Sequence, residues 1–228
     1  METDKERYKL RLLLEIGAFL AAFYNTFLSI LWHGFRNFSY FTVLSNIWVM
    51  IMMAVSIFFI FTGRKRGKAF TVVKMLATNA ITITFLIYLV ILAPTDPRGF
   101  FGAYAKEAFS SLAAHVICPL CALFDYILYD EPVELKGFKK LIFTAFPLFY
   151  LFYSLLLGPV MGMRWREMRM PYNFLNFDAP CSWFGFRPDT LSSTTVGVGV
   201  AYIMVFLFLL FVGVGMLTLF IQKKVQKV

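Results

Sequence analysis

The sequence predicts an all-α, polytopic membrane protein built as a bundle of six transmembrane helices. Hydropathy separates six apolar segments, each close to the about 20 residues that a helix needs to cross a bilayer. The chain is 60% hydrophobic and only 15% charged, so a water-facing surface could not cover it. Backbone groups in lipid must find hydrogen bonds within their own segment, and this requirement makes the spans helices.

The six spans follow one another with short connections, so we predict a single membrane domain over residues 1–228. Pro94 and Pro97 follow the third span and Pro132 follows the fourth, as expected just beyond helix ends. Before the sixth span, Asp189, Ser192 and Ser193 are predicted helix caps. The expected spans are 12–32, 39–61, 69–93, 108–129, 141–161 and 194–221.

The excess of basic residues predicts orientation in the membrane. The net charge is +9, but the lysines and arginines fall in blocks beside the helix ends, so we expect no nucleic-acid partner. With the N-terminus in the cytoplasm, fifteen of the 22 basic residues lie on the cytoplasmic side. The positive-inside rule therefore predicts that both termini are cytoplasmic.

The segment 162–193 is longer than an ordinary connection and rich in aromatic residues, which favours an ordered re-entrant or interfacial cap with rings at headgroup level. Its arginines Arg164, Arg166 and Arg169 are predicted to bind an anionic headgroup or a fatty-acid carboxylate, because guanidinium groups match such oxygens. A simple interfacial anchor is the alternative.

The cysteines and histidines predict no metal centre or other cofactor. Cys118 and Cys121 form a C-P-L-C string inside an apolar helix, which favours core packing over redox work. His33 and His115 have no carboxylate pair nearby in the sequence, so they do not form a ligand set.

Ionisable residues inside the spans are candidates for function. Glu15 and Lys74 lie near predicted cytoplasmic helix ends, where they would pair with each other or extend to the interface. Asp125 follows His115 by ten residues, about 15 Å along a helix, which is too far to orient the imidazole. We therefore expect Asp125 to be a solvated or paired carboxylate.

A polar stripe opens the second span and suggests a site. Thr42, Ser45 and Asn46 share one helix face at a depth similar to that of His115 in the fourth span. A hydroxyl beside a histidine is the nucleophile and base pair of acyl-transfer enzymes. The alternative is that Thr42 bonds its own helix backbone and His115 bonds a neighbouring helix.

Three strings, in this order, support the catalytic interpretation: FSYFTVLSN, AAHVICPLCALFDY and PYNFLNF. Over most of the chain, their order and spacing resemble the androgen-induced gene 1 family of six-pass membrane proteins and its bacterial relatives. The resemblance implies a threonine-dependent hydrolase that cleaves fatty acid esters of hydroxy fatty acids, with Thr42 and His115 as catalytic residues. Its partners would be membrane lipids and a fatty acyl ester substrate.

Ser45 and Asn46 are predicted to line the substrate site, and the third catalytic group stays open among Asn46, Asn176 and Asp178. The alternative function is a non-catalytic transporter or lipid-binding protein. In a transporter, Asn25, Asn79, His115 and Asp125 would line a continuous route; otherwise the asparagines link helices.

Overall fold

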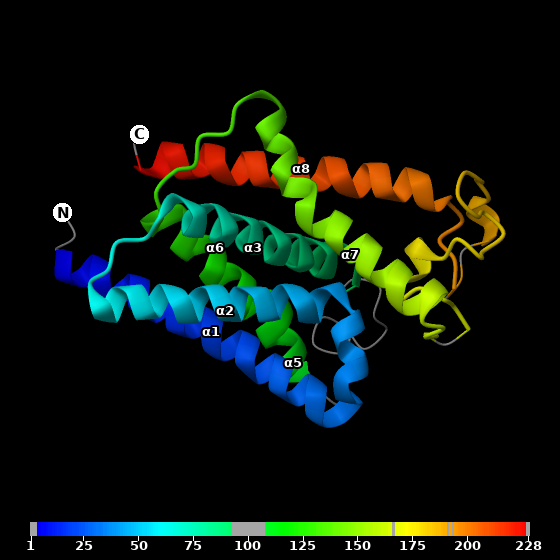
Figure 1. Cartoon of the computed structure of the whole chain (residues 1–228), viewed down its shortest axis with the longest axis horizontal. Coiled ribbons are helices and arrows are strands. Elements are labelled where there is room, and N and C mark those ends of the chain that lie inside the picture. The colour runs from blue at the N-terminus through cyan, green and yellow to red at the C-terminus, as the bar shows by residue number, and fades with distance from the viewer. Residues whose placement is uncertain (1–3, 93–107, 166, 191, 193, 227–228) are drawn as a thin grey trace. The chain divides into compact units, whose positions relative to one another are not determined.

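The computed structural model describes residues 4–92, 108–165, 167–190, 192 and 194–226. Within these ranges, six helices are long and apolar enough to cross a membrane, and the only β-structure is isolated bridges. The predicted all-α class of a six-pass membrane protein is thereby confirmed (Figure 1). Arg166, Ser193, Pro94 and Pro97, named above, lie outside the described residues.

The chain forms two compact units, Met1–Lys140 with Val214–Val228, and Leu141–Gly213. The single domain expected over the whole chain stays a prediction. The helix α8 belongs to both units, with residues 200–213 in the second and 214–226 in the first.

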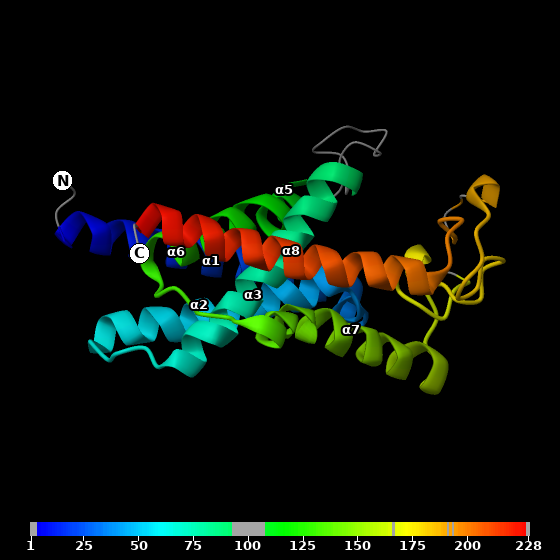
Figure 2. The same ribbon diagram turned by 90° about the horizontal axis from the view of Figure 1, so that it is seen from above.

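The first unit is a ring of four long helical segments. The α1 helix contacts α2 and α6, and α3 also contacts both of them, which closes the ring (Figures 1 and 2). Between α1 and α2 lies the short helix η1 (Gly34–Ser39). The long segments are α1 (Asp4–His33), α2 (Phe41–Thr62), α3 (Lys68–Ile87) with η2 (Tyr88–Leu92), and α5 (Ala108–Leu112) with η3 (Ala113–Ile117) and α6 (Cys118–Tyr129).

All four segments repeat one spacing of buried residues: a polar residue, apolar residues three and seven positions later, and a second polar residue at ten. This spacing keeps one face of a helix toward the bundle. All the members are buried: Glu15, Ala18, Ala22 and Asn25 in α1; Asn46, Val49, Met53 and Ser56 in α2; Lys74, Ala77, Ile81 and Thr84 in α3; His115, Cys118, Ala122 and Asp125 in η3 and α6.

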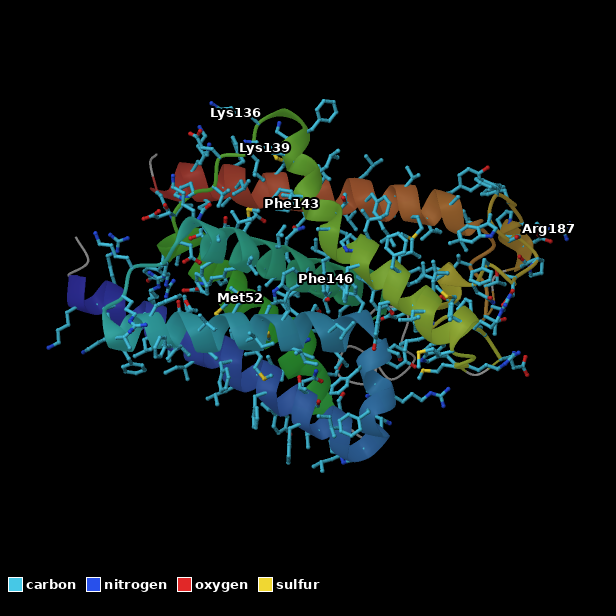
Figure 3. The ribbon with its side chains drawn as sticks, viewed as in Figure 1. Met52, Lys136, Lys139, Phe143, Phe146 and Arg187 are labelled. Carbon is cyan, nitrogen blue, oxygen red and sulfur yellow. The ribbon has the colours of Figure 1, made fainter. Side chains whose placement is uncertain are left out.

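The apolar members form the middle of the core. Alanines supply several of these positions, and small residues let helices pack closely in a membrane. Met52, which Figure 3 marks along α2, also belongs to this core. Cys118 is fully buried within it, which confirms the predicted packing role. Polar layers therefore lie above and below an apolar centre, about 15 Å apart at the rise of an α-helix.

A π-helical turn interrupts the fourth segment where proline would otherwise be costly. Pro119 has no N–H, and its ring clashes with the carbonyl four residues earlier in a regular helix. The turn η3 precedes this proline, and the Cys118 N–H bonds to the Ala113 carbonyl five residues back. This local widening accommodates Pro119 and carries His115.

The second unit holds the fifth span from Leu141 onward and the start of the sixth. The fifth span runs from η4 (Gly137–Thr144) through α7 (Ala145–Leu155) to η5 (Leu156–Val160), close to the expected 141–161. The loop that follows includes the short helices η6 (Asn173–Leu175) and η7 (Pro188–Thr190). The last helix, α8, covers Val200–Gln226.

The predicted start of the sixth span was wrong by six residues. Residues 194–199 are non-helical because they pair with the preceding loop: Arg187 N–H bonds to Gly197 O at 2.7 Å, and Ser192 N–H bonds to Thr195 O at 2.9 Å. Asp189 lies in η7 and Ser192 in this pairing, so neither caps α8.

Candidate functional site

One polar layer of the first unit surrounds His115, and we call it the histidine layer. The imidazole is buried and stacks on the ring of Tyr88 with centroids 4.5 Å apart. Three other helical segments thus supply neighbours to the turn η3 that carries the histidine. The members are Asn25 in α1; Ser45 and Asn46 in α2; Thr84 in α3; Tyr88 in η2; Ser110 and Ser111 in α5; and His115.

The backbone fixes the tautomer of His115. Its Nδ1 lies 2.9 Å from the Ser111 carbonyl oxygen, which can only accept a hydrogen bond. Nδ1 therefore carries the proton, and in the neutral ring the lone pair lies on Nε2. The Ser111 hydroxyl is also close to Nδ1, at 3.3 Å. A histidine held in this way presents Nε2 as its basic atom.

Asn46 links the helix turn that carries Thr42 to the residue beside His115. Its Nδ2 donates to the Thr42 carbonyl at 2.8 Å and to the Ala114 carbonyl at 3.3 Å. Both donor hydrogens of the fully buried amide are used, which fixes its orientation. Asn46 thus holds one turn of α2 against η3.

Ser45 links α2 to α3. Its hydroxyl lies 3.1 Å from the Thr84 hydroxyl and 3.0 Å from the Thr42 carbonyl, to which it donates. The predicted substrate-site residues Ser45 and Asn46 are therefore brought into one layer with His115. Thr42 is half-buried on the preceding turn of α2, and the pairing of its hydroxyl with the imidazole stays a prediction.

Several buried polar atoms at this depth have no hydrogen-bond partner among the described residues: Asn46 Oδ1, Asn25 Nδ2 and Thr26 Oγ1. Ser110 donates to the other amide atom of Asn25, Oδ1, at 3.1 Å. Buried polar groups are usually paired, so these atoms leave unused hydrogen-bonding capacity in the histidine layer.

The second polar layer is ionic, and we call it the charged layer. Lys74 Nζ lies 2.5 Å from Asp125, 2.7 Å from Asp130 and 3.4 Å from Glu15, and all four side chains are buried. Arg66 bonds Glu15 and Asp130, each at 2.9 Å. Arg11 bonds the same two carboxylates, at 3.2 and 2.8 Å.

Three cations meet three carboxylates in this layer, so its charge is balanced. The predicted pairing of Glu15 with Lys74 is confirmed, and Asp125 is paired rather than solvated. Arg11, Arg66 and Asp130 were missed, because hydropathy places them near the ends of spans. Ser56, whose hydroxyl donates to Glu15 at 2.6 Å, was also missed, and the ten-residue interval between polar residues was a signal for it.

Two of the predicted anion-binding arginines, Arg164 and Arg169, lie in the described part of the loop of the second unit. Arg169 forms a two-pronged ion pair with Asp178 and lies over the Phe177 ring, 5.1 Å from its centroid. The hydrogen bond from Arg169, together with its charge, holds the pKa of Asp178 below its usual value. Arg164 is exposed, and its binding to an anionic lipid stays a prediction.

The other proposed third catalytic residue, Asn176, also has a partner within the loop. Its Nδ2 donates to the Thr194 carbonyl at 2.7 Å, and its Oδ1 accepts from the Asp178 N–H at 3.2 Å. These bonds give Asn176 a structural role in the second unit. Among the three open choices, Asn46 lies in the histidine layer.

Comparisons with protein-family models, with characterised proteins and with solved structures found no match to this chain. The resemblance to the androgen-induced gene 1 family therefore stays a prediction from three short strings.

Proposed function

We propose that this integral membrane protein hydrolyses a lipid ester, with Thr42 as nucleophile and His115 as base. The observation that carries the proposal is the double hydrogen bond of Asn46, which ties the Thr42 carbonyl to Ala114, next to the histidine. A nucleophile and a base on two different helices need such a tie to keep their spacing. The resemblance of the YFTVLSN and AHVICP strings to the hydrolase family supports the same pair.

The proposed reaction has two steps. The Thr42 hydroxyl attacks the ester carbonyl while His115 Nε2 takes its proton, and the departing alcohol receives that proton as the C–O bond breaks. Water then attacks the acylated threonine with help from the same base, which releases the fatty acid and restores Thr42. Ser45 and Asn46 line the site. The substrate class is an apolar acyl ester that enters sideways from the membrane.

The alternative function is transport or lipid binding without chemistry. A route past Asp125 would have to cross the charged layer, where Lys74 lies 2.5 Å from that carboxylate. Moving a substrate through would require separation of a buried ion pair, which costs several kcal/mol in a low dielectric (about 3–5 when one partner is lost). A pocket confined to the histidine layer needs no such opening, and we therefore favour the hydrolase.

Labelling with a lipophilic fluorophosphonate tests the proposal, because the probe reacts with an activated hydroxyl. We expect labelling of the wild-type protein in detergent and its loss in Thr42→Ala and in His115→Ala. Thr62→Ala is the matched control, since it removes a threonine hydroxyl from the exposed end of the same helix and should still be labelled. If Thr42→Ala keeps the label, Thr42 is not the nucleophile.

A further inference from the structure

The loop before α8 contains a tight turn, residues 181–187, which we call the aromatic turn. Gly185 N–H bonds to the Cys181 carbonyl at 2.7 Å and closes it. A Cβ on Gly185 would lie 2.5 Å from that carbonyl oxygen, so only glycine fits the closure. Cys181, the first residue of the turn, is buried, whereas Phe184 and Phe186 are 72% and 70% exposed.

The aromatic turn is attached to the first residues of α8. The N–H groups at the start of a helix have no partner inside it. Here Gly199, Val200 and Ala201 donate to the carbonyls of Gly185, Ser182 and Trp183, at 2.7, 3.1 and 3.0 Å. A Cβ on Gly199 would lie 2.5 Å from the Trp183 carbonyl oxygen. The turn therefore caps α8 and keeps a fixed position at its beginning.

The exposed rings of the turn continue an exposed apolar face of α8. Phe184 meets Tyr202 edge to face, with centroids 6.3 Å apart. Three further exposed residues lie three, four and seven positions after Tyr202 on α8. Together they form one stripe along the helix: Tyr202, Val205, Phe206 and Leu209. Along a membrane-spanning helix, such a stripe faces lipid.

We propose that the aromatic turn inserts into the boundary between headgroups and acyl chains, with Phe184 and Phe186 immersed in lipid. The start of a spanning helix lies at this boundary, where aromatic side chains are favoured. Arg187 is exposed at the end of the turn, where a guanidinium can meet a lipid phosphate (Figure 3). The other half of the loop turns its apolar groups inward, since Trp165, Met168 and Met170 are buried.

Nitroxide labels on single cysteines test the insertion. The labels replace Phe184 and Phe186 in a chain whose native cysteines are changed to alanine, reconstituted in phosphatidylcholine and phosphatidylglycerol vesicles. Asp189→Cys is the matched control, because Asp189 is exposed in the same loop but outside the aromatic turn. We expect the collision rate with oxygen, relative to that with a water-soluble nickel chelate, to be several-fold higher at 184 and 186 than at 189.

Equal ratios at the three positions would overturn the proposal. Exclusion of both reagents, with dipolar broadening between labels, would also overturn it and would indicate that a second copy of the chain covers the rings. Replacement of the buried native cysteines can unfold the chain, so a second measurement keeps them. Lipids brominated near the headgroup should quench less tryptophan fluorescence in Trp183→Phe than in wild type, and equal quenching would count against insertion.

Discussion

We expect the stability of the first unit to depend strongly on Lys74, because its ammonium group is buried among three carboxylates. Removal of one partner from a buried ionic cluster leaves the others uncompensated. Lys74→Met should therefore lower the free energy of unfolding by about 3–5 kcal/mol. Unfolding in mixed micelles at increasing denaturant measures the effect.

Lys68→Met is the control for Lys74→Met, since Lys68 is exposed on the same helix and should change stability by less than about 0.5 kcal/mol. Adding Asp125→Asn to Lys74→Met should recover part of the loss, because the double variant buries one fewer unpaired charge. If Lys74→Met lowered the free energy of unfolding as little as Lys68→Met does, the ion pairs would contribute nothing to stability.

The ion pair of Asp178 with Arg169 predicts a pH dependence. The pKa of Asp178 is lowered in the folded protein, so the stabilisation is complete above the unfolded carboxyl pKa of about 4 and is lost as pH falls through the folded value. Asp178→Asn should therefore lower the melting temperature at pH 7 and have little effect near pH 2. Arg169→Gln should give the same pattern, and adding it to Asp178→Asn should cause little further loss.

At the residue scale, the sequence predicted which pairs of polar residues meet better than it predicted all the members of each polar layer. Glu15 and Lys74 could be paired because their depths are similar, and Ser45, Asn46 and His115 were expected to meet for the same reason. The participation of Arg66 and Asp130 could not be predicted, because it depends on which helices are neighbours. Hydropathy gives the depth of a residue but not the direction in which it points.

At the scale of elements, the four helices of the first unit share a polar, apolar, apolar, polar spacing. This spacing can be seen in the sequence. That the polar residues of the four helices meet in two layers follows only from the closed ring of α1, α2, α3 and α6. The late start of α8 could not be read from hydropathy, because residues 194–199 are apolar enough to resemble a helix. Their hydrogen bonds with the preceding loop decide against it.

The end of α6 depends on a side chain from α8, and this yields a prediction. The last carbonyls of a helix lack partners within it. Gln222, fully buried, donates to the carbonyls of Tyr126 and Asp130 at 3.0 and 2.9 Å. Gln222→Met should therefore lower the free energy of unfolding by about 1–3 kcal/mol, since it removes two buried hydrogen bonds of about 0.5–1.5 kcal/mol each. The two carbonyls keep one donor each, because Gln226 Nε2 bonds to the Asp130 carbonyl at 2.9 Å and Asp130 N–H bonds to the Tyr126 carbonyl at 3.4 Å. The exposed neighbour Lys224→Met should be close to neutral, and equal melting temperatures for both variants would remove this role.

For the whole molecule, orientation follows from charge and can be measured. Fifteen of the 22 basic residues fall on the side assigned to the cytoplasm. Single cysteines at the exposed positions Thr62 and Ser192 should therefore react with an impermeant maleimide from opposite sides, Thr62 from the cytoplasm. Reaction of the cysteine at position 62 from outside intact cells would show that the topology is the reverse of the predicted one.

The most direct test of the proposed function is hydrolysis itself. Purified wild-type protein should release fatty acid from a branched fatty acid ester of a hydroxy fatty acid, with Thr42→Ser retaining part of the rate. Thr42→Ala and His115→Ala should each lower the rate at least about a hundred-fold, because nucleophile and base act as one unit. The melting temperature of Thr42→Ala should stay near that of wild type, because Thr42 is half-buried. That of His115→Ala should fall, because the substitution removes a buried ring that stacks on Tyr88. Hydrolysis by Thr42→Ala at the wild-type rate would contradict the account.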